Sequence, residues 1–166
     1  MVGDTPSPTL PRFAGEGEGL RVRALAVLKD VVDPEIPVLT IADLGILRDV
    51  SVDGDSVEVT ITPTYSGCPA MHAITLDIQA ALTRAGIKAR VRTVLSPAWT
   101  TDWMSEAAKE KLAAFGIAPP ERGARLKCPL CGSEDTEQIS AFGSTPCKAL
   151  WRCDDCLEPF DRFKCH

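Results

Sequence analysis

The cysteines of this chain are concentrated near one end. Six of the seven lie within residues 128–166, whereas Cys68 stands alone. Two Cys-x-x-Cys pairs, Cys128–Cys131 and Cys153–Cys156, are separated by 21 residues, a spacing that a hairpin can absorb. Four thiolates on two tight turns predict a closed tetrahedral metal site with a structural role. We expect zinc there, with a single iron ion or a cysteine-ligated cluster as the alternatives.

A bound metal would also let this end of the chain fold. Residues 125–166 have no helical period and only short candidate strands, around 138–142 and 149–152. A segment of roughly 40 residues buries too little apolar surface to order itself without a staple. These residues are therefore predicted to form a zinc ribbon.

Three further potential ligands remain in the same segment: Cys147, Cys165 and His166. One interpretation is that the two cysteines are small buried hydrophobic residues near the metal site and that the terminal histidine is exposed. The other is that the three residues form a second thiolate-rich spot that holds or passes iron.

Composition places the chain among ordinary globular proteins. It has 166 residues, of which 45% are hydrophobic and 25% charged, and no stretch approaches the roughly 18 apolar residues of a membrane span. Residues 1–19 lack the basic and apolar regions of a secretory signal and are predicted to be a flexible leader. We therefore expect a cytoplasmic protein without a membrane partner, in a reducing compartment that favours metal ligation over disulfides.

The net charge of −5 is spread along the chain. It is −2 over residues 1–19, −2 over 20–120 and −1 over 121–166. Proteins that bind nucleic acid normally show a cluster of basic residues that neutralises phosphates. The charge pattern thus argues against a nucleic-acid partner.

Hydrophobic periodicity predicts a small α/β (α+β) domain over residues 20–118, followed by a linker at 119–124. Residues 46–52 and 56–61 are expected to pair as a hairpin around Asp53-Gly54. The other expected elements are a helix over 20–32 with Leu25, Leu28 and Val32 on its apolar face, a helix from Cys68 to Gly86, a strand over 89–95 and a helix over 105–115.

The loop TPTYSGCPAM places Cys68 at the start of a helix, where backbone N–H groups and the helix dipole favour a thiolate. The alternative is a cysteine packed under the first helical turn. His72 lies four residues on, so a catalytic Cys–His pair is a third interpretation. Asp33, Glu35 and Asp43 lie in the irregular segment before the hairpin and either cap turns or hold a metal.

These motifs resemble known families. DPEIPVLTIADLGILRDV and TPTYSGCPAM resemble the α/β domain of SufT-type iron-sulfur assembly factors, which have a DPE turn, a DLG segment and a loop with a single cysteine. SPAWTTDWMSEAAKEKLAAFGIAPP and FGSTPCKALWRCDDCLEPFDRFKCH look like the PaaD family, accessory subunits of the phenylacetyl-CoA epoxidase system. Together the two resemblances cover nearly the whole chain after residue 19.

The resemblance implies a non-catalytic protein of phenylacetate degradation that acts beside a di-iron oxygenase and its reductase. In such factors the position of Cys68 is thought to handle iron or a cluster, with Asp33 and Asp43 near it. One cysteine cannot hold a cluster alone, so a homodimer bridged by a transient iron-sulfur cluster is implied, with transfer to the reductase. The ribbon would be a docking surface for the reductase or the oxygenase subunits, with Trp151, Phe160 and Phe163 as anchors.

Other functions remain open at this point. A stoichiometric structural subunit of the oxygenase complex would use the same surfaces as a maturation factor. A thiol enzyme would use Cys68 and His72. A zinc-ribbon protein that binds nucleic acid is disfavoured by the charge of the ribbon segment.

Overall fold

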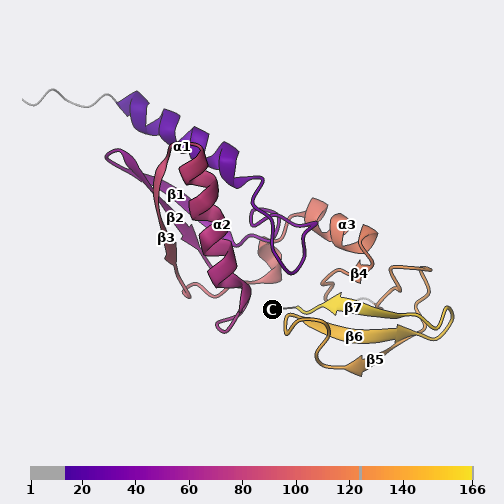
Figure 1. The fold of residues 1–166 in the computed structure, drawn as a ribbon. Helices are drawn as coiled ribbons and strands as arrows, with labels where there is room; N and C mark the ends of the chain where they lie inside the picture. The colour runs from indigo at the N-terminus through magenta and orange to yellow at the C-terminus, as the bar shows by residue number, and fades with distance from the viewer. Residues whose placement is uncertain (1–13, 124, 166) are drawn as a thin grey trace, which may run out of the picture.

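The computed structural model describes residues 14–123 and 125–165 and shows two small sheets joined by helices and loops (Figure 1). The first sheet has the strand order β1-β2-β3 and the second the order β4-β7-β6-β5. The elements are α1 (Ala14–Leu28), β1 (Leu47–Asp53), β2 (Ser56–Ile61), α2 (Ala70–Arg84), β3 (Lys88–Thr93), the 3-10 helix η1 (Thr101–Trp103), α3 (Glu106–Ala114), β4 (Ile117–Ala118), β5 (Thr136–Ser140), β6 (Lys148–Cys153) and β7 (Pro159–Phe163). Within the described residues, none of the helices is long and apolar enough to cross a bilayer.

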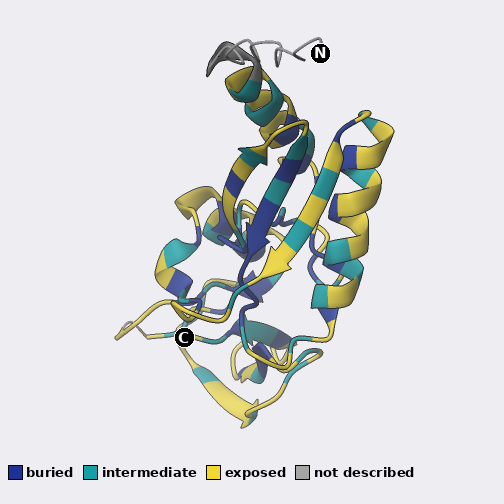
Figure 2. Cartoon of the chain, turned by 90° about the vertical axis from the view of Figure 1, so that its left-hand side faces the viewer, coloured by how far each residue is buried: buried dark blue, intermediate teal, exposed yellow. Residues whose placement is uncertain are grey.

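The predicted hairpin is confirmed. β1 and β2 pair antiparallel around a turn in which Gly54 has a φ of 63°, a conformation that glycine adopts without strain. Along β2 the alternate residues Val57, Val59 and Ile61 are buried. β3 then pairs parallel to β2, because α2 returns the chain to the same end of the sheet. Figure 2 shows the central strand and the inward side of α2 as the most buried parts of this layer.

The first helix differs from the prediction. It begins at Ala14, so residues 14–19 are helical rather than part of a leader, and residues 1–13 lie outside the described residues. It ends at Leu28, and the turn that follows directs Val31 inward. Leu25 and Val32 are therefore 37% and 42% exposed, and the residues that face the core are Ala24, Leu28 and Val31. The predicted apolar face was wrong because the helix stops one turn early.

The second sheet takes one strand from the segment assigned to the first domain. β4 pairs parallel to β7, with Ile117 opposite Asp161, so the sheet begins before the predicted linker. β5 and β6 were expected at 138–142 and 149–152 and lie within two residues of those positions. β4 and β7 were not predicted. Two residues carry no periodicity, and β7 becomes a strand only by pairing on both sides.

The two modules share a core. Phe163 of β7 is 1% exposed, and its ring centroid lies 6.0 Å from that of Trp99 in the loop before η1. The Trp99 indole Nε1 in turn donates to the carbonyl of Leu44 at 2.9 Å. Phe160 is also buried, in a smaller cluster beside the ribbon cysteines. Phe160 and Phe163 therefore hold the fold together and are not docking anchors, which corrects the sequence-based expectation; Trp151 is half-buried.

Candidate functional site

The ribbon cysteines form the metal site that their spacing predicts. The sulfur atoms of Cys128, Cys131, Cys153 and Cys156 all lie within 4.8 Å of one another. The Sγ atoms of Cys128 and Cys156 are 3.8 Å apart, and those of Cys131 and Cys153 are 3.5 Å apart. Zn–S bonds of about 2.3 Å in a tetrahedron place sulfur atoms about 3.8 Å from each other. The four residues thus fit a zinc ion, which would supply folding free energy and leave no coordination position for chemistry.

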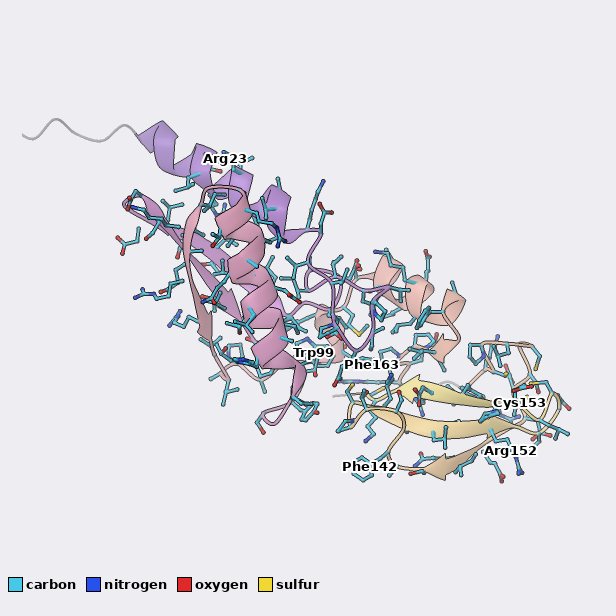
Figure 3. The ribbon with its side chains drawn as sticks, viewed as in Figure 1. Arg23, Trp99, Phe142, Arg152, Cys153 and Phe163 are labelled. Carbon is cyan, nitrogen blue, oxygen red and sulfur yellow. The ribbon has the colours of Figure 1, made fainter. Side chains whose placement is uncertain are left out.

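Each ribbon pair sits on the same type of turn. Backbone bonds from Gly132 N to Cys128 O (2.9 Å) and from Cys153 N to Glu158 O (3.1 Å) close the two loops. The residue after the second cysteine is left-handed in both, with a φ of 80° at Gly132 and 64° at Leu157. Backbone N–H groups of Cys156 and Asp155 lower the pKa of the Cys153 thiol to about 7, which favours the metal-binding form. Figure 3 places Cys153 at the end of the ribbon that is remote from Trp99.

Cys68 lies in the loop between β2 and α2 and is half-buried. Its N–H donates to the Tyr65 carbonyl at 3.1 Å, which closes a tight turn two residues before the helix. The hydroxyl of Tyr65 is inaccessible to solvent and has no hydrogen-bond partner among the described residues. A groove of about 300 Å³, lined by residues 62–66 together with Leu95, Ala98 and Trp99, runs along the same loop.

The structure contradicts the expected thiolate at Cys68. Burial raises the pKa of this thiol, and the carboxylates of Glu35 and Asp33 raise it further. The backbone N–H of Ala70 and the hydroxyl of Thr64 act in the opposite direction but do not compensate. The helix N-terminus was a correct observation, but its effect is smaller than desolvation combined with nearby negative charge. Cys68 therefore stays protonated until a cation approaches.

The DPE turn brings Asp33 and Glu35 near Cys68. Asp33 is buried, and its Oδ1 accepts the N–H groups of Glu35 at 2.7 Å and Ile36 at 2.9 Å. Burial raises the pKa of both carboxyl groups, and each also feels the positive charge of Lys148 from the ribbon. Asp33 thus caps its turn, whereas no hydrogen bond or ion pair to the Glu35 carboxylate occurs among the described residues.

Asp43 does not join this group. Its Oδ2 accepts the Thr40 N–H at 3.1 Å and pairs with the Lys111 ammonium of α3 at 2.6 Å. Burial alone would raise the pKa of Asp43, but the Lys111 ammonium and Thr40 hold it below its ordinary value. Asp43 therefore fixes α3 against the DLG segment, and its predicted place beside Cys68 is not what the described contacts show.

The remaining sequence-predicted residues are separated from Cys68 or from each other. His72 is exposed on α2, and no described contact joins it to Cys68, so the catalytic pair is not assembled. Cys147 is buried and Cys165 is exposed, and no contact between their sulfur atoms is found in the described part of the chain. His166 lies outside the described residues. The predicted second thiolate spot therefore does not form as proposed.

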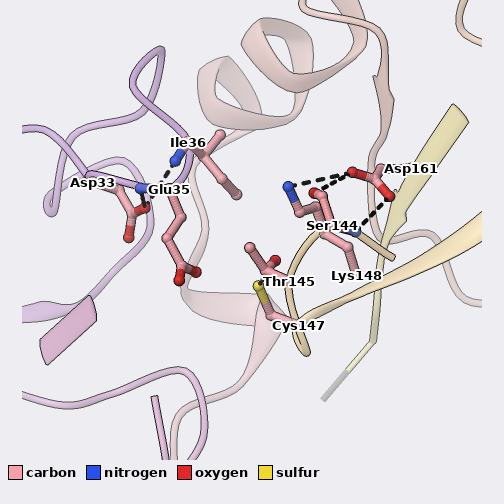
Figure 4. Close-up of polar contacts among 8 residues, drawn as sticks. All are labelled: Asp33, Glu35, Ile36, Ser144, Thr145, Cys147, Lys148 and Asp161. Atoms are coloured by element: carbon pink, nitrogen blue, oxygen red, sulfur yellow. Dashed lines mark hydrogen bonds and ion pairs between the residues drawn. The ribbon is translucent and has the colours of Figure 1, made fainter. Parts of the chain in front are cut away.

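Cys147 instead faces the first module, which the sequence did not indicate. Its Sγ lies 3.0 Å from Thr145 Oγ1, and burial raises the pKa of its thiol, as do the charges of Glu35 and Asp33 (Figure 4). Lys148, next to it, is 4% exposed, with its Nζ 3.4 Å from Asp161 Oδ2. A buried lysine in a strand was visible in the alternation of β6, but nothing in the sequence says which module it faces.

Comparison with known proteins agrees with both modules. Residues 21–96 match the family "Iron-sulfur cluster assembly protein", and residues 117–164 match the family "PaaD zinc beta ribbon domain". A relative from Escherichia coli (strain K12), which carries the name "Putative 1,2-phenylacetyl-CoA epoxidase" and is designated as one of its subunits, is 49% identical over 148 residues. The matched region covers 84% of this chain and 90% of that protein.

Two further relatives match the first module. The "Fe-S protein maturation auxiliary factor YitW" of Bacillus subtilis (strain 168) is 38% identical over 60% of this chain and 97% of its own length. A solved structure, a domain of unknown function DUF59 from Bacillus anthracis, superposes with a TM-score of 0.56 at 31% identity and covers 60% of this chain and 97% of the solved chain. With an iron-sulfur assembly domain followed by a four-cysteine ribbon in one chain, the protein belongs to the PaaD family.

Proposed function

We propose that this protein is an accessory maturation factor of the phenylacetyl-CoA epoxidase system and assists iron-sulfur cluster assembly on the reductase component. The observation that carries the proposal is the position of Cys68. It is the one cysteine of the iron-sulfur assembly domain, and it lies half-buried in a loop beside a groove and a solvent-inaccessible, unpartnered tyrosine hydroxyl. The names of the relatives supply the system and the type of cargo.

The chemistry follows from the protonation state of Cys68. A thiol whose pKa is raised by burial and carboxylates is a poor nucleophile, which argues against a thiol enzyme. An arriving iron centre changes the balance, because its positive charge compensates the carboxylates and displaces the thiol proton. The bound cargo then leaves by thiolate exchange with the cysteines of the acceptor protein. The zinc ribbon stays closed throughout and acts as scaffold.

The test is the cluster content of the reductase matured in cells that carry variants of this protein. Cys68→Ser is expected to lower iron and acid-labile sulfide per reductase chain, whereas Cys165→Ser, which changes an exposed cysteine, is expected to leave both at the wild-type level. A fully clustered reductase in the Cys68→Ser strain would overturn the proposal. His72→Ala is a second control, and a loss of clusters in this variant would instead favour the thiol enzyme.

A second candidate is a stoichiometric component of the oxygenase complex, which the designation of the E. coli relative as a subunit favours. The two candidates differ after assembly is complete. A maturation factor is dispensable then, so chromatographic removal of the protein from the mature enzyme leaves activity intact. A structural subunit predicts that activity is lost on removal and returns when the protein is added back.

A further inference from the structure

The two cysteines outside the zinc knuckles come from different modules but approach the same place. Cys147 is part of the larger buried core, and Cys68 and Tyr65 pack against that core from the loop before α2. The phenol of Tyr65 is close enough to both sulfur atoms for Cys68 and Cys147, after burial, to raise its pKa. The junction between the α/β domain and the ribbon thus holds one thiol from each side.

A carboxylate completes this group. Figure 4 shows the side chain of Glu35 extending from the DPE turn toward Thr145 and Cys147. The charge of Glu35 acts on both thiols, and no described hydrogen bond or ion pair engages its carboxylate. Asp33 is different, because one of its oxygens is already used by two backbone N–H groups. Glu35 is therefore the carboxylate that remains available as a ligand.

The local charge favours a cation. Lys148 is the buried basic residue at this junction, but its Nζ pairs with Asp161, which also accepts hydrogen bonds from the N–H and hydroxyl of Ser144. The thiols and carboxylates on the other side of Lys148 share what is left of its charge. A site with two sulfur atoms and one carboxylate, short of positive charge, matches the ligand preference of Fe²⁺ and Zn²⁺ rather than that of Mg²⁺ or Ca²⁺.

We infer that Cys68, Cys147 and Glu35 form a single-chain binding site for a thiophilic divalent cation of the Fe²⁺ class, across the junction of the two modules. The inference rests on the proposed function and deepens it: the cargo is held by two thiols of one protomer, so a second copy of the chain is not needed. Among the described residues only the zinc knuckles have three or more ligand atoms within 4.8 Å. The junction site is therefore open, closes around its ion by side-chain rotation and keeps a position free for transfer.

The experiment is a cobalt titration of the full chain under anaerobic conditions. The knuckles are first filled with zinc, which cobalt does not displace because zinc binds such sites more tightly. Cobalt bound to thiolates is then read from its sulfur-to-metal charge-transfer absorption. The expected result is one further equivalent per chain, with no change in the monomer's sedimentation. Cys68→Ser and Cys147→Ser are each expected to halve this absorption and to weaken binding at least tenfold.

Three variants make the result specific. Glu35→Gln should weaken binding with little loss of the thiolate signal, whereas Cys165→Ser should change neither. Zinc content and far-ultraviolet circular dichroism check folding, and Cys147→Ala provides a second, less polar replacement for the buried thiol. Binding that survives both Cys147 variants, that needs two chains, or that is absent from the wild type would overturn the inference.

The outcomes separate this inference from the proposed function. If Cys68→Ser depletes the reductase of clusters and the Cys147 variants do not, the maturation role stands and the two-thiol site is rejected. If the cobalt site forms as described but no variant affects the reductase, the site is real and its role in maturation is rejected.

Discussion

The rings of Trp99 and Phe163 pack against each other with their centroids 6.0 Å apart, and they join the loop after β3 to the last strand of the ribbon. Trp99 is 5% exposed and Phe163 is 1% exposed. Because each residue completes the core of the other's module, the α/β domain and the ribbon should unfold together rather than as independent units.

Phe163→Ala tests this coupling. Removing a fully buried phenylalanine should lower the free energy of unfolding by about 3–5 kcal/mol. Denaturation of the zinc-loaded protein, followed by tryptophan fluorescence and by zinc release, should show the same midpoint with both probes. Phe142→Ala is the control, because Phe142 is 65% exposed and its loss should cost little. Separate midpoints in the wild-type protein would contradict a shared core.

The left-handed residues of the two zinc knuckles give an opposed pair of variants. Gly132 adopts its φ of 80° without strain, whereas a Cβ at Leu157 makes the φ of 64° cost about 1–2 kcal/mol. Gly132→Ala should therefore destabilise the zinc-loaded ribbon, and Leu157→Gly should stabilise it by about 1 kcal/mol. Thermal unfolding at saturating zinc measures both. If Leu157→Gly destabilises the protein, its exposed side chain has a packing role that the described contacts do not show.

The Asp43–Lys111 pair predicts a pH-dependent contribution to stability. The pKa of Asp43 lies below its ordinary 3.8 in the folded protein, so the unfolded chain binds more protons in acid and the stabilisation is lost as pH falls through the folded-state pKa. Lys111→Met should lower the free energy of unfolding by about 1 kcal/mol at neutral pH. This difference from wild type should vanish well below pH 3.8.

The difference between the two proteins is the quantity to measure, because acid also protonates the zinc thiolates. Lys109→Met is the matched control on the same helix. Its partner Glu106 is 84% exposed, so the control should have a smaller effect. A difference between Lys111→Met and wild type that does not change with pH would mean that Lys111 acts through packing.

Alkylation tests the protonation state of Cys68. In the metal-free junction at neutral pH, iodoacetamide should modify the exposed Cys165 before Cys68, because burial and the carboxylates of Glu35 and Asp33 raise the Cys68 pKa. Glu35→Gln removes one of these charges and should speed modification of Cys68. Peptide mass spectrometry after a short exposure measures both rates. Preferential labelling of Cys68 in the wild type would restore the sequence-based expectation of a thiolate.

Local elements of the fold were predictable from the sequence. The hairpin follows from alternation around Asp53-Gly54, and α2 follows from Ile74, Ile78 and Leu82, which are all buried. Cys-x-x-Cys spacing was sufficient for the metal site, because both turns are set within a few residues. Each of these features depends on short-range patterns that leave a direct trace in the sequence.

Features that depend on packing between the modules were not predictable. The inward position of Val31 depends on where α1 stops, and the burial of Phe163 depends on Trp99, 64 residues earlier. The raised pKa of Cys68 results from Glu35 and Asp33, whose distance from the loop is set by the tertiary fold alone. Cys147 was assigned to the wrong partners for the same reason.

The DLG segment shows how one short motif depends on such packing. Gly45 has a φ of 69°, and a Cβ at this position would lie 2.6 Å from the carbonyl oxygen of Trp103. Gly45→Ala is therefore expected to displace η1 and to lower the melting temperature of the whole protein. Gly86→Ala, where φ is 71° but no atom lies within 4 Å of the added carbon, isolates the backbone strain from the clash.

The course of the chain after β7 has a consequence for handling the protein. Lys164 donates its N–H to the Cys147 carbonyl at 2.9 Å and its ammonium to the Pro146 carbonyl at 2.8 Å. Any oligohistidine tag joined beyond Cys165 would therefore begin beside the junction, where its imidazoles would compete for the same divalent ions. A tag attached ahead of α1 would emerge at the opposite end of the molecule (Figure 1) and leave metal analysis undisturbed.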